Sequence, residues 1–204
     1  MSKAGYVITA KGRLSYAQYI YTAQENKQGK EMYSGAILIP PTANLSVLKN
    51  KMGEIGLPNL DGDKNRTKKI VMKRFLDPND LPNGGKPAGE EFEGWTLLRS
   101  SNSNQPKVFY PNGDLIPDNQ ISKEMYSGRW ASFLLNPYWS GNSENPGVFL
   151  SLQGVQLLDH DENIGANIPD AEGEFDAVEV DGVESKPAST SGDTSDNDVD
   201  DMFG

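Results

Sequence analysis

The sequence predicts an all-β domain with one short helix, followed by a disordered acidic C-terminal tail. Two observations carry the prediction for the folded part: short apolar runs of period two separated by turn residues, and one segment with helical spacing. A third observation marks the tail, where periodicity ends and acidic residues dominate. We therefore divide the 204-residue chain into a folded domain, residues 1–160, and a tail, residues 161–204.

The clearest strand signal lies in residues 126–159, which read YSGRWASFLLNPYW, SGNSENPG and VFLSLQGVQLLD. Two apolar, aromatic-rich runs flank a loop of small and polar residues, which predicts a β-hairpin. In the second run Val148, Leu150 and Leu152 share one face, and the apolar positions change parity at Gly154. A glycine at a parity change predicts a β-bulge.

Six shorter strands are predicted, at residues 6–10, 14–21, 32–39, 68–75, 95–100 and 107–110. Both faces of the second half of 32–39 are apolar, which places this strand centrally in the sheet. The one helix follows Pro41: Leu45, Leu48 and Met52 recur at three- and four-residue steps, with Thr42 as the N-cap and a stop at Gly53 or Gly56. We expect it to plug one end of the sheet.

The charge is divided unevenly along the chain. Residues 1–158 hold 18 Lys and Arg against 14 Asp and Glu, a charge of +4, whereas residues 159–204 hold one Lys against 15 acids, a charge of −14. So charged a segment cannot bury enough apolar surface to offset an ordering entropy of about 1–2 kcal/mol per residue. A hydrophobic residue ends its acidic run, and we interpret the end of the tail as a docking peptide for a partner protein, formed by Asp196, Asp198, Asp200, Asp201 and Phe203.

Catalysis and metal binding find no support in the sequence. There is no cysteine, the one histidine is His160 at the domain edge, and no GxSxG, GxxxxGK[ST], HExxH or GxGxxG motif occurs. Asp61-Gly62-Asp63 fails as a calcium loop because Lys64 and Arg66 stand where acids are needed. The sequence thus predicts no enzyme, cofactor or metal site. Without an h-region or a membrane-length apolar stretch, we expect an intracellular protein with no membrane partner.

Binding of single-stranded nucleic acid fits the folded part better. About five to seven short strands with one intervening helix match the OB-fold β-barrel pattern. A sequence-tolerant site needs rings on which bases stack and cations that follow the phosphates, and the predicted strands supply both. The candidate DNA-binding residues are Arg13, Tyr16, Lys73, Arg74, Trp95, Arg99, Lys107, Tyr126, Arg129, Trp130, Tyr138 and Trp139.

Four segments resemble, in order, successive blocks of the phage-encoded single-stranded-DNA-binding proteins with an OB fold. They are RLSYAQYIY, YSGAILIPP followed by a helix, GWTLLRSSN, and YSGRWASFLLNPYW with GVFLSLQGVQLLD. The resemblance implies sequence-independent binding and protection of single-stranded DNA in phage replication and recombination, in the cytoplasm of the infected bacterial host. It also implies an acidic tail that regulates DNA binding and recruits replication or recombination proteins. Gly204 follows Phe203, whereas such tails commonly end on Phe.

Other function classes stay open at this stage. The domain could be an interaction adaptor that binds one protein while the tail recruits another, or an acidic DNA mimic that inhibits a host enzyme. A carbohydrate-binding barrel is a weaker alternative, because aromatic platforms also stack on sugars but the folded part is basic.

Overall fold

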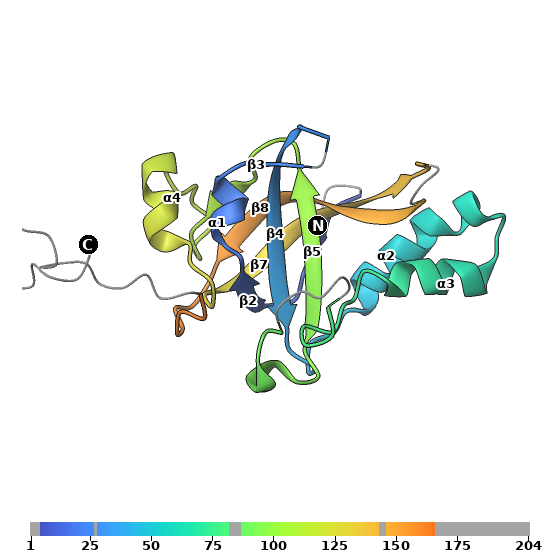
Figure 1. The fold of residues 1–204 in the computed structure, drawn as a ribbon, viewed down its shortest axis with the longest axis horizontal. Helices are drawn as coiled ribbons and strands as arrows, with labels where there is room; N and C mark the ends of the chain where they lie inside the picture. Colours follow the sequence, from blue (N-terminus) through green and yellow to red (C-terminus); the bar gives the residue numbers. More distant parts are fainter. Residues whose placement is uncertain (1–4, 27, 82–86, 143–145, 166–204) are drawn as a thin grey trace, which may run out of the picture. The chain divides into compact units, whose positions relative to one another are not determined.

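The computed structural model describes residues 5–26, 28–81, 87–142 and 146–165 (Figure 1). Almost all of the predicted tail, including its docking residues Asp196, Asp198, Asp200, Asp201 and Phe203, lies outside this part of the chain. The described residues are mostly β-sheet with a few helices. Among them, no helix is long and apolar enough to cross a membrane.

Eight strands form the sheet: β1 (Val7–Ile8), β2 (Gly12–Ser15), β3 (Gln24–Glu25), β4 (Glu31–Ile39), β5 (Thr96–Asn102), β6 (Lys107–Phe109), β7 (Trp130–Ser140) and β8 (Gly147–Leu157). Strand β7 pairs with β2, and the pairing continues through β4, β5 and β8 before β8 returns to β7. These pairings close a ring of five strands, to which β1, β3 and β6 are attached (Figure 1). β4 lies between β2 and β5, which confirms the predicted central strand.

The long hairpin is confirmed, and so is its irregularity. In the β7–β8 ladder Leu134 pairs with Gly154 and Leu135 with Leu152, so Gln153 is an extra residue on β8. This is the bulge expected next to the glycine. Leu152 before the bulge and Val155 after it are both buried. The extra residue therefore allows apolar side chains on both sides of the bulge to face the same core.

The helices differ most from the prediction of a single helix. The described residues contain α1 (Gln18–Tyr21), α2 (Ser46–Gly56), α3 (Lys64–Met72) and α4 (Asp118–Glu124), with 3₁₀ turns η1 (Pro58–Leu60) and η2 (Glu90–Phe92). The strand predicted at residues 68–75 is therefore wrong. Asp63 caps α3 by accepting a 2.9 Å hydrogen bond from the Arg66 amide, and Thr67 and Val71, four residues apart, are the buried positions.

Two smaller boundaries also move. The strand predicted at residues 14–21 stops at Ser15, because Tyr16 adopts a left-handed conformation (φ 55°) and α1 begins two residues later. The predicted helix exists as α2 but starts later than a Thr42 cap requires, since Asn44 accepts a 2.8 Å hydrogen bond from the Ser46 amide. Leu48 and Met52 of α2 join the core as expected.

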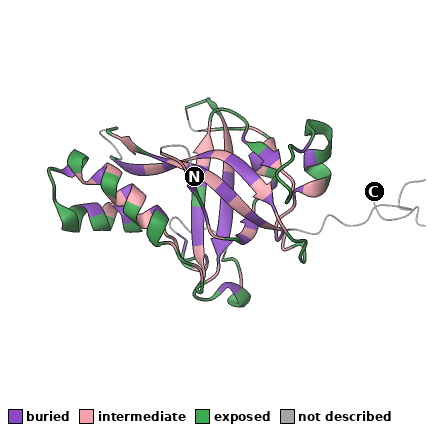
Figure 2. Ribbon diagram, turned by 180° about the vertical axis from the view of Figure 1, so that it is seen from behind, coloured by how far each residue is buried: buried purple, intermediate pink, exposed green. Residues whose placement is uncertain are grey.

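Strand alternation on β4 separates two apolar clusters. Ile37 and Ile39 belong to the main core inside the strand ring, where Phe133 is among the fully buried side chains. Ala36 and Leu38 face the other way into a smaller cluster, which also contains Phe92. Figure 2 shows that the strands at the centre are largely buried, whereas the helices are exposed on their outer surfaces. The outer face of β4 thus carries the second cluster, and the candidate site lies beside it.

Candidate nucleic-acid interface

One row of side chains crosses four neighbouring strands on the outer face of the sheet. Trp130 on β7 pairs with Arg13 on β2, Arg13 pairs with Leu38 on β4, and Leu38 pairs with Leu97 on β5. Directly paired residues of neighbouring strands point to the same face. The register therefore sets an indole and a guanidinium side by side next to the apolar floor of the second cluster.

Two more rings and a second cation complete this group. The Trp95 ring lies 6.1 Å from that of Trp130 and 5.2 Å, edge-on, from that of Phe92. Lys11 Nζ lies 4.8 Å from the centre of the Trp130 ring, and the Arg13 guanidinium 5.8 Å from that of Phe92. We call Lys11, Arg13, Phe92, Trp95 and Trp130 the ring–cation cluster. Phe92 is buried (1% exposed) and supports the cluster from below, so only Trp95 and Trp130 offer ring surface to solvent. Accessible rings beside cations are what stacked bases and their phosphates require.

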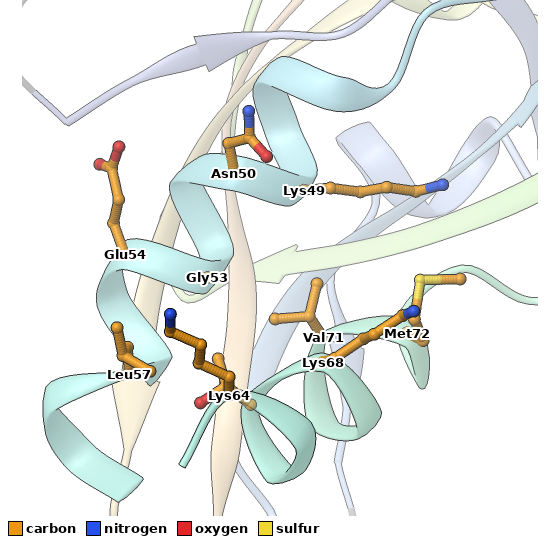
Figure 3. Close-up of a pocket in the computed structure, with 10 residues that line it drawn as sticks. Lys49, Asn50, Gly53, Glu54, Leu57, Lys64, Lys68, Val71 and Met72 are labelled. Carbon is orange, nitrogen blue, oxygen red and sulfur yellow. The ribbon is translucent and has the colours of Figure 1, made fainter. Parts of the chain in front are cut away.

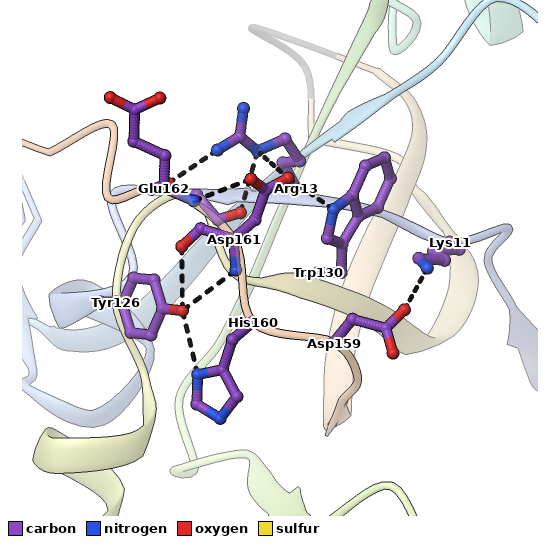
Figure 4. Close-up of polar contacts among 9 residues, drawn as sticks. Lys11, Arg13, Tyr126, Trp130, Asp159, His160, Asp161 and Glu162 are labelled. Atoms are coloured by element: carbon purple, nitrogen blue, oxygen red, sulfur yellow. Dashed lines mark hydrogen bonds and ion pairs between the residues drawn. The ribbon is translucent and has the colours of Figure 1, made fainter.

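The end of the described chain covers this cluster. We call residues 159–165 the acidic strap (Figure 4). Asp159 pairs with Lys11, and Asp161 Oδ2 lies 3.6 Å from Arg13 Nε. The Trp130 indole N–H donates a 2.7 Å hydrogen bond to the Asp161 carboxylate. Arg13 Nη2 also donates a 2.7 Å hydrogen bond to the carbonyl oxygen of Glu162. Both cations and the indole are thus held by oxygen acceptors of the strap.

The segment Tyr126-Ser127-Gly128 holds the other side of the strap. The Tyr126 hydroxyl donates to the carbonyl of Asp161 at 3.1 Å, and its ring stacks on His160 with centroids 6.1 Å apart. Its oxygen lies 3.1 Å from His160 Nδ1 (Figure 4). The Ile164 amide donates a 3.0 Å bond to the Ser127 carbonyl. The strap is therefore bound along its length, and His160 is exposed but not without partners.

The strap's two leading carboxylates remain ionised in this position. Hydrogen bonding by Lys11, aided by its charge, lowers the pKa of Asp159. Hydrogen bonds from the Glu162 amide and from the Trp130 indole lower the pKa of Asp161, with smaller contributions from the charges of Arg13 and Lys11. Because the attached strap has the lower pKa values, its attachment is favoured above the ordinary aspartate pKa of about 3.9 and lost as pH falls through the lowered values.

A hollow of about 340 Å³ continues from the strap across the outer face of β2, β4 and β5. Tyr16, which is 44% exposed, lies at its edge and stacks on Tyr19 at 6.3 Å. Arg99 lies exposed on the same sheet face, one row beyond Leu97. The lining residues are Ser15, Tyr16, Gln18, Leu38, Pro78, Leu81, Pro87, Ala88, Leu97, Ser127, Ile164 and Gly165. Its volume lies within the range of about 300–1,000 Å³ that is typical of small-ligand sites.

Comparison with known proteins identifies the family. The family model described as "Enterobacter phage Enc34, ssDNA-binding protein" matches residues 5–184. The chain belongs to this family. No curated protein sequence matches it.

The fold is that of the solved Enc34 proteins. The single-stranded DNA-binding protein from bacteriophage Enc34 in complex with ssDNA is 21% identical, with a TM-score of 0.65 over 80% of this chain and 91% of that one. A second structure of the single-stranded DNA-binding protein from bacteriophage Enc34 is 22% identical, with a TM-score of 0.60 over 85% of this chain and 92% of that one. A C-terminal truncation of the Enc34 protein is also 22% identical, with a TM-score of 0.58 over 79% of this chain and 89% of that one. At these identities the likeness shows a shared fold.

The predicted site residues of this Enc34-family chain separate into groups. Arg13, Tyr16, Trp95, Tyr126 and Trp130 lie at the strap or the hollow, with Arg99 nearby on the same face. Lys73 and Lys107 are exposed, and no contact among the described residues joins them to the ring–cation cluster.

Arg129 stands apart because it is buried. It is 3% exposed and donates hydrogen bonds of 2.6 and 2.7 Å to the carboxylate and carbonyl of Glu124. A guanidinium enclosed and paired in this way is not free to follow phosphates. We therefore leave Arg129 out of the proposed site.

Arg74, Tyr138 and Trp139 gather at the far end of the β7–β8 hairpin. The Arg74 guanidinium lies 3.8 Å from the Phe149 ring centre, and the Tyr138 and Phe149 rings are 6.0 Å apart. Partial burial lowers the pKa of Arg74, and Tyr138 opposes this. Trp139 packs against the main core. Tyr138 is eight residues from Trp130 along β7, about 26 Å at the rise of a strand, so these residues do not belong to the ring–cation cluster.

Residue-by-residue scanning missed Lys11, Phe92 and the strap itself. Lys11 lies at the turn before β2, and its distance from Asp159 in the sequence hides their ion pair. The sequence contains one signal that could have indicated the strap. The acid-rich segment DHDE, residues 159–162, directly follows the last strand of a domain that is otherwise basic.

Gly128 offers a test of how closely the strap is fitted. Its φ is +103°, and a Cβ there would collide with the carbonyl oxygen of Glu162. Gly113 has a similar φ of +90° but no atom within 4 Å of such a Cβ. Both alanine variants carry the backbone strain, so Gly128→Ala should destabilise the protein by about 1–3 kcal/mol more than Gly113→Ala. Urea unfolding of the two variants measures the difference, and equal losses would show that the strap does not press on Gly128.

Proposed function

We propose that this chain binds single-stranded DNA without sequence preference and protects it during phage DNA replication and recombination, as a binding protein rather than an enzyme. The observation that carries the proposal is the row that joins Trp130 and Arg13 across β7 and β2, with Trp95 and Lys11 beside them. Membership of the Enc34 family supports it, since the Enc34 single-stranded DNA-binding protein has been solved in complex with ssDNA. The site of action we propose is the cytoplasm of the infected bacterium.

The proposed site divides the work between rings and cations. Trp130 and Trp95 are half-buried, so each offers part of a ring face on which a base stacks, at about 1–3 kcal/mol per base. Lys11, Arg13 and Arg99 lie along the same face and neutralise phosphates. Such contacts do not distinguish one base from another, because every base has a π-face and every nucleotide a phosphate.

We further propose that the acidic tail regulates this binding. In the strap, the Asp161 carboxylate takes the place of a phosphate on Arg13 and bonds the Trp130 indole, so bound DNA must displace it. The residues beyond the strap, 166–204, carry one Lys and 12 acids and extend the same charge. We propose that Asp196, Asp198, Asp200, Asp201 and Phe203 recruit replication or recombination proteins.

The finer fold assignment belongs to the same proposal. We infer an OB-fold β-barrel, residues 1–160, followed by an acidic tail, residues 161–204. The first residues of the tail, 161–165, belong to the strap, and we infer that the rest of the tail is disordered. The closed pairing of β7, β2, β4, β5 and β8 supports the barrel. The bulge at Gln153 and Gly154 supports it as well, since bulges bend strands around barrel corners.

A titration with oligo-dT, oligo-rU and duplex DNA of equal length, each at two salt concentrations, tests the function. We expect oligo-dT to quench the tryptophan fluorescence and duplex to bind much more weakly. If Lys11, Arg13 and Arg99 each meet one phosphate, the log–log salt slope should be about −2 for a single strand. Absence of quenching, or affinity that does not change with salt, would contradict the proposal.

A further inference from the structure

A second surface feature lies away from the ring–cation cluster, between α2 and α3 (Figure 3). It is a groove of about 550 Å³. Its apolar lining comes from Leu57, Val71 and Met72, and Met72 is 42% exposed. Gly53 leaves the α2 side open, because no atom lies within 4 Å of a Cβ placed there. The groove is thus an unfilled apolar channel on the surface of a helical hairpin.

Positive charge surrounds the channel. Lys49, Lys64 and Lys68 line it, and Glu54 is the one acid among its lining residues. Residues 46–74, which include both helices, hold eight Lys and Arg against three acids, a charge of +5. Residues 1–158 as a whole carry only +4. The net positive charge of the folded part therefore resides in this hairpin, which favours an anionic occupant.

The chemistry of the lining favours a peptide over a nucleic acid. None of the side chains that line the groove is aromatic, so it offers no ring on which a base could stack. An apolar channel with a lysine rim instead suits one or two large apolar side chains flanked by carboxylates. This combination occurs at the end of the chain itself, where Asp196, Asp198, Asp200 and Asp201 precede Met202 and Phe203.

We propose that the α2–α3 groove binds the C-terminal segment, residues 196–203, of a second copy of this chain. The inference rests on the proposed docking role of the tail and names its partner as a neighbouring molecule. Phe203 lies 38 positions after Gly165 in the sequence. A flexible chain of that length spans roughly 31–37 Å on average, about the diameter of a domain of this size. Molecules that sit side by side on one strand are within that reach, so the contact links neighbours.

Photo-crosslinking of the full-length protein tests the contact. The chain contains no cysteine to complicate the analysis, and Phe203 is replaced by p-benzoylphenylalanine. Irradiation without DNA at low salt should give a dimer on a denaturing gel, with the crosslink mapped by mass spectrometry to Leu57, Val71 or Met72. Gly53→Leu fills the channel and should lower the dimer yield at least about fivefold, whereas Gly53→Ala should leave it unchanged. Lys64→Glu with Lys68→Glu should lower it as well.

Three results would overturn the inference: crosslinks that map to β2 or β7, products confined to the monomer, or a dimer yield that Gly53→Leu does not change. Thermal unfolding and oligo-dT quenching of both Gly53 variants show that they are folded and that the ring–cation cluster is intact. Since the crosslink is read without DNA, its failure leaves the proposed DNA binding standing. Conversely, if the protein forms the crosslink but does not bind oligo-dT, the result contradicts the proposed function and leaves the proposed contact between copies standing.

Discussion

Replacing Trp130 with alanine is expected to weaken binding of oligo-dT by about 5- to 150-fold, the equivalent of ~1–3 kcal/mol for one stacked base. Trp130 is half-buried and pairs with Arg13 on the neighbouring strand. The centroid of its ring lies 6.1 Å from that of Trp95. The substitution therefore removes a stacking surface and one wall of the cluster. Fluorescence anisotropy of a labelled oligonucleotide measures the effect, with circular dichroism as the check on folding.

Trp130→Phe separates the ring from its N–H group. Phenylalanine keeps a stacking face but cannot donate the 2.7 Å hydrogen bond to Asp161. We expect this variant to retain most of the affinity, since losing the hydrogen bond also loosens the strap that competes with DNA. Equal affinities for wild type and Trp130→Ala would remove Trp130 from the site.

The second large effect concerns the strap. Changing Asp159 and Asp161 together to asparagine removes the carboxylates that hold Lys11, Arg13 and the Trp130 indole. Both acids are exposed, where single ion pairs contribute little, so we expect oligo-dT to bind about two- to fivefold more tightly at low salt. The gain should shrink as salt rises, because charges at the surface are screened over about 10 Å at 0.1 M.

Glu162→Gln is the matched control. It lowers the negative charge of the strap by one, but only the backbone carbonyl of Glu162 bonds Arg13. The affinity of this variant should stay close to that of the wild type. If it tightens binding as much as the aspartate pair does, general charge rather than the specific contacts of the strap governs competition.

Strands β4, β7 and β8 were predictable because the alternation of apolar residues shows which residues share a face. The two-residue strand β3 was not predicted, because Gln24 and Glu25 are polar and carry no such pattern. The apolar residues on both sides of β4, and the parity change at Gly154, fix a central strand and a bulge by local pattern alone. Helix α3 was not predictable in this way. Residues 68–75, KKIVMKRF, overlap the second half of α3 and contain a short apolar run that suits a strand as well as a helix. The helix is favoured by the Asp63 cap together with burial of Thr67 and Val71.

The arrangement of the candidate site was only partly predictable, for a related reason. Residue type alone pointed to Arg13, Trp95 and Trp130, because rings and cations on strands suit single-stranded nucleic acid. Residue type cannot show that Arg129 is buried and paired with Glu124, because the sequence does not distinguish a buried arginine from an exposed one. Nor can it show that the first residues of the predicted tail meet the same cations, because that contact joins Arg13 to Asp161, which are separated by nearly the whole folded part in the sequence.

Fluorine NMR of 5-fluorotryptophan-labelled protein tests the central claim most directly. The chain has three tryptophans, and substitution of each in turn assigns its resonance. On addition of oligo-dT we predict that the resonances of Trp130 and Trp95 shift, because DNA replaces the strap on the ring–cation cluster. The resonance of Trp139, which packs against the main core at the other end of β7, should not shift. A shift of Trp139 with Trp130 and Trp95 unchanged would contradict the account.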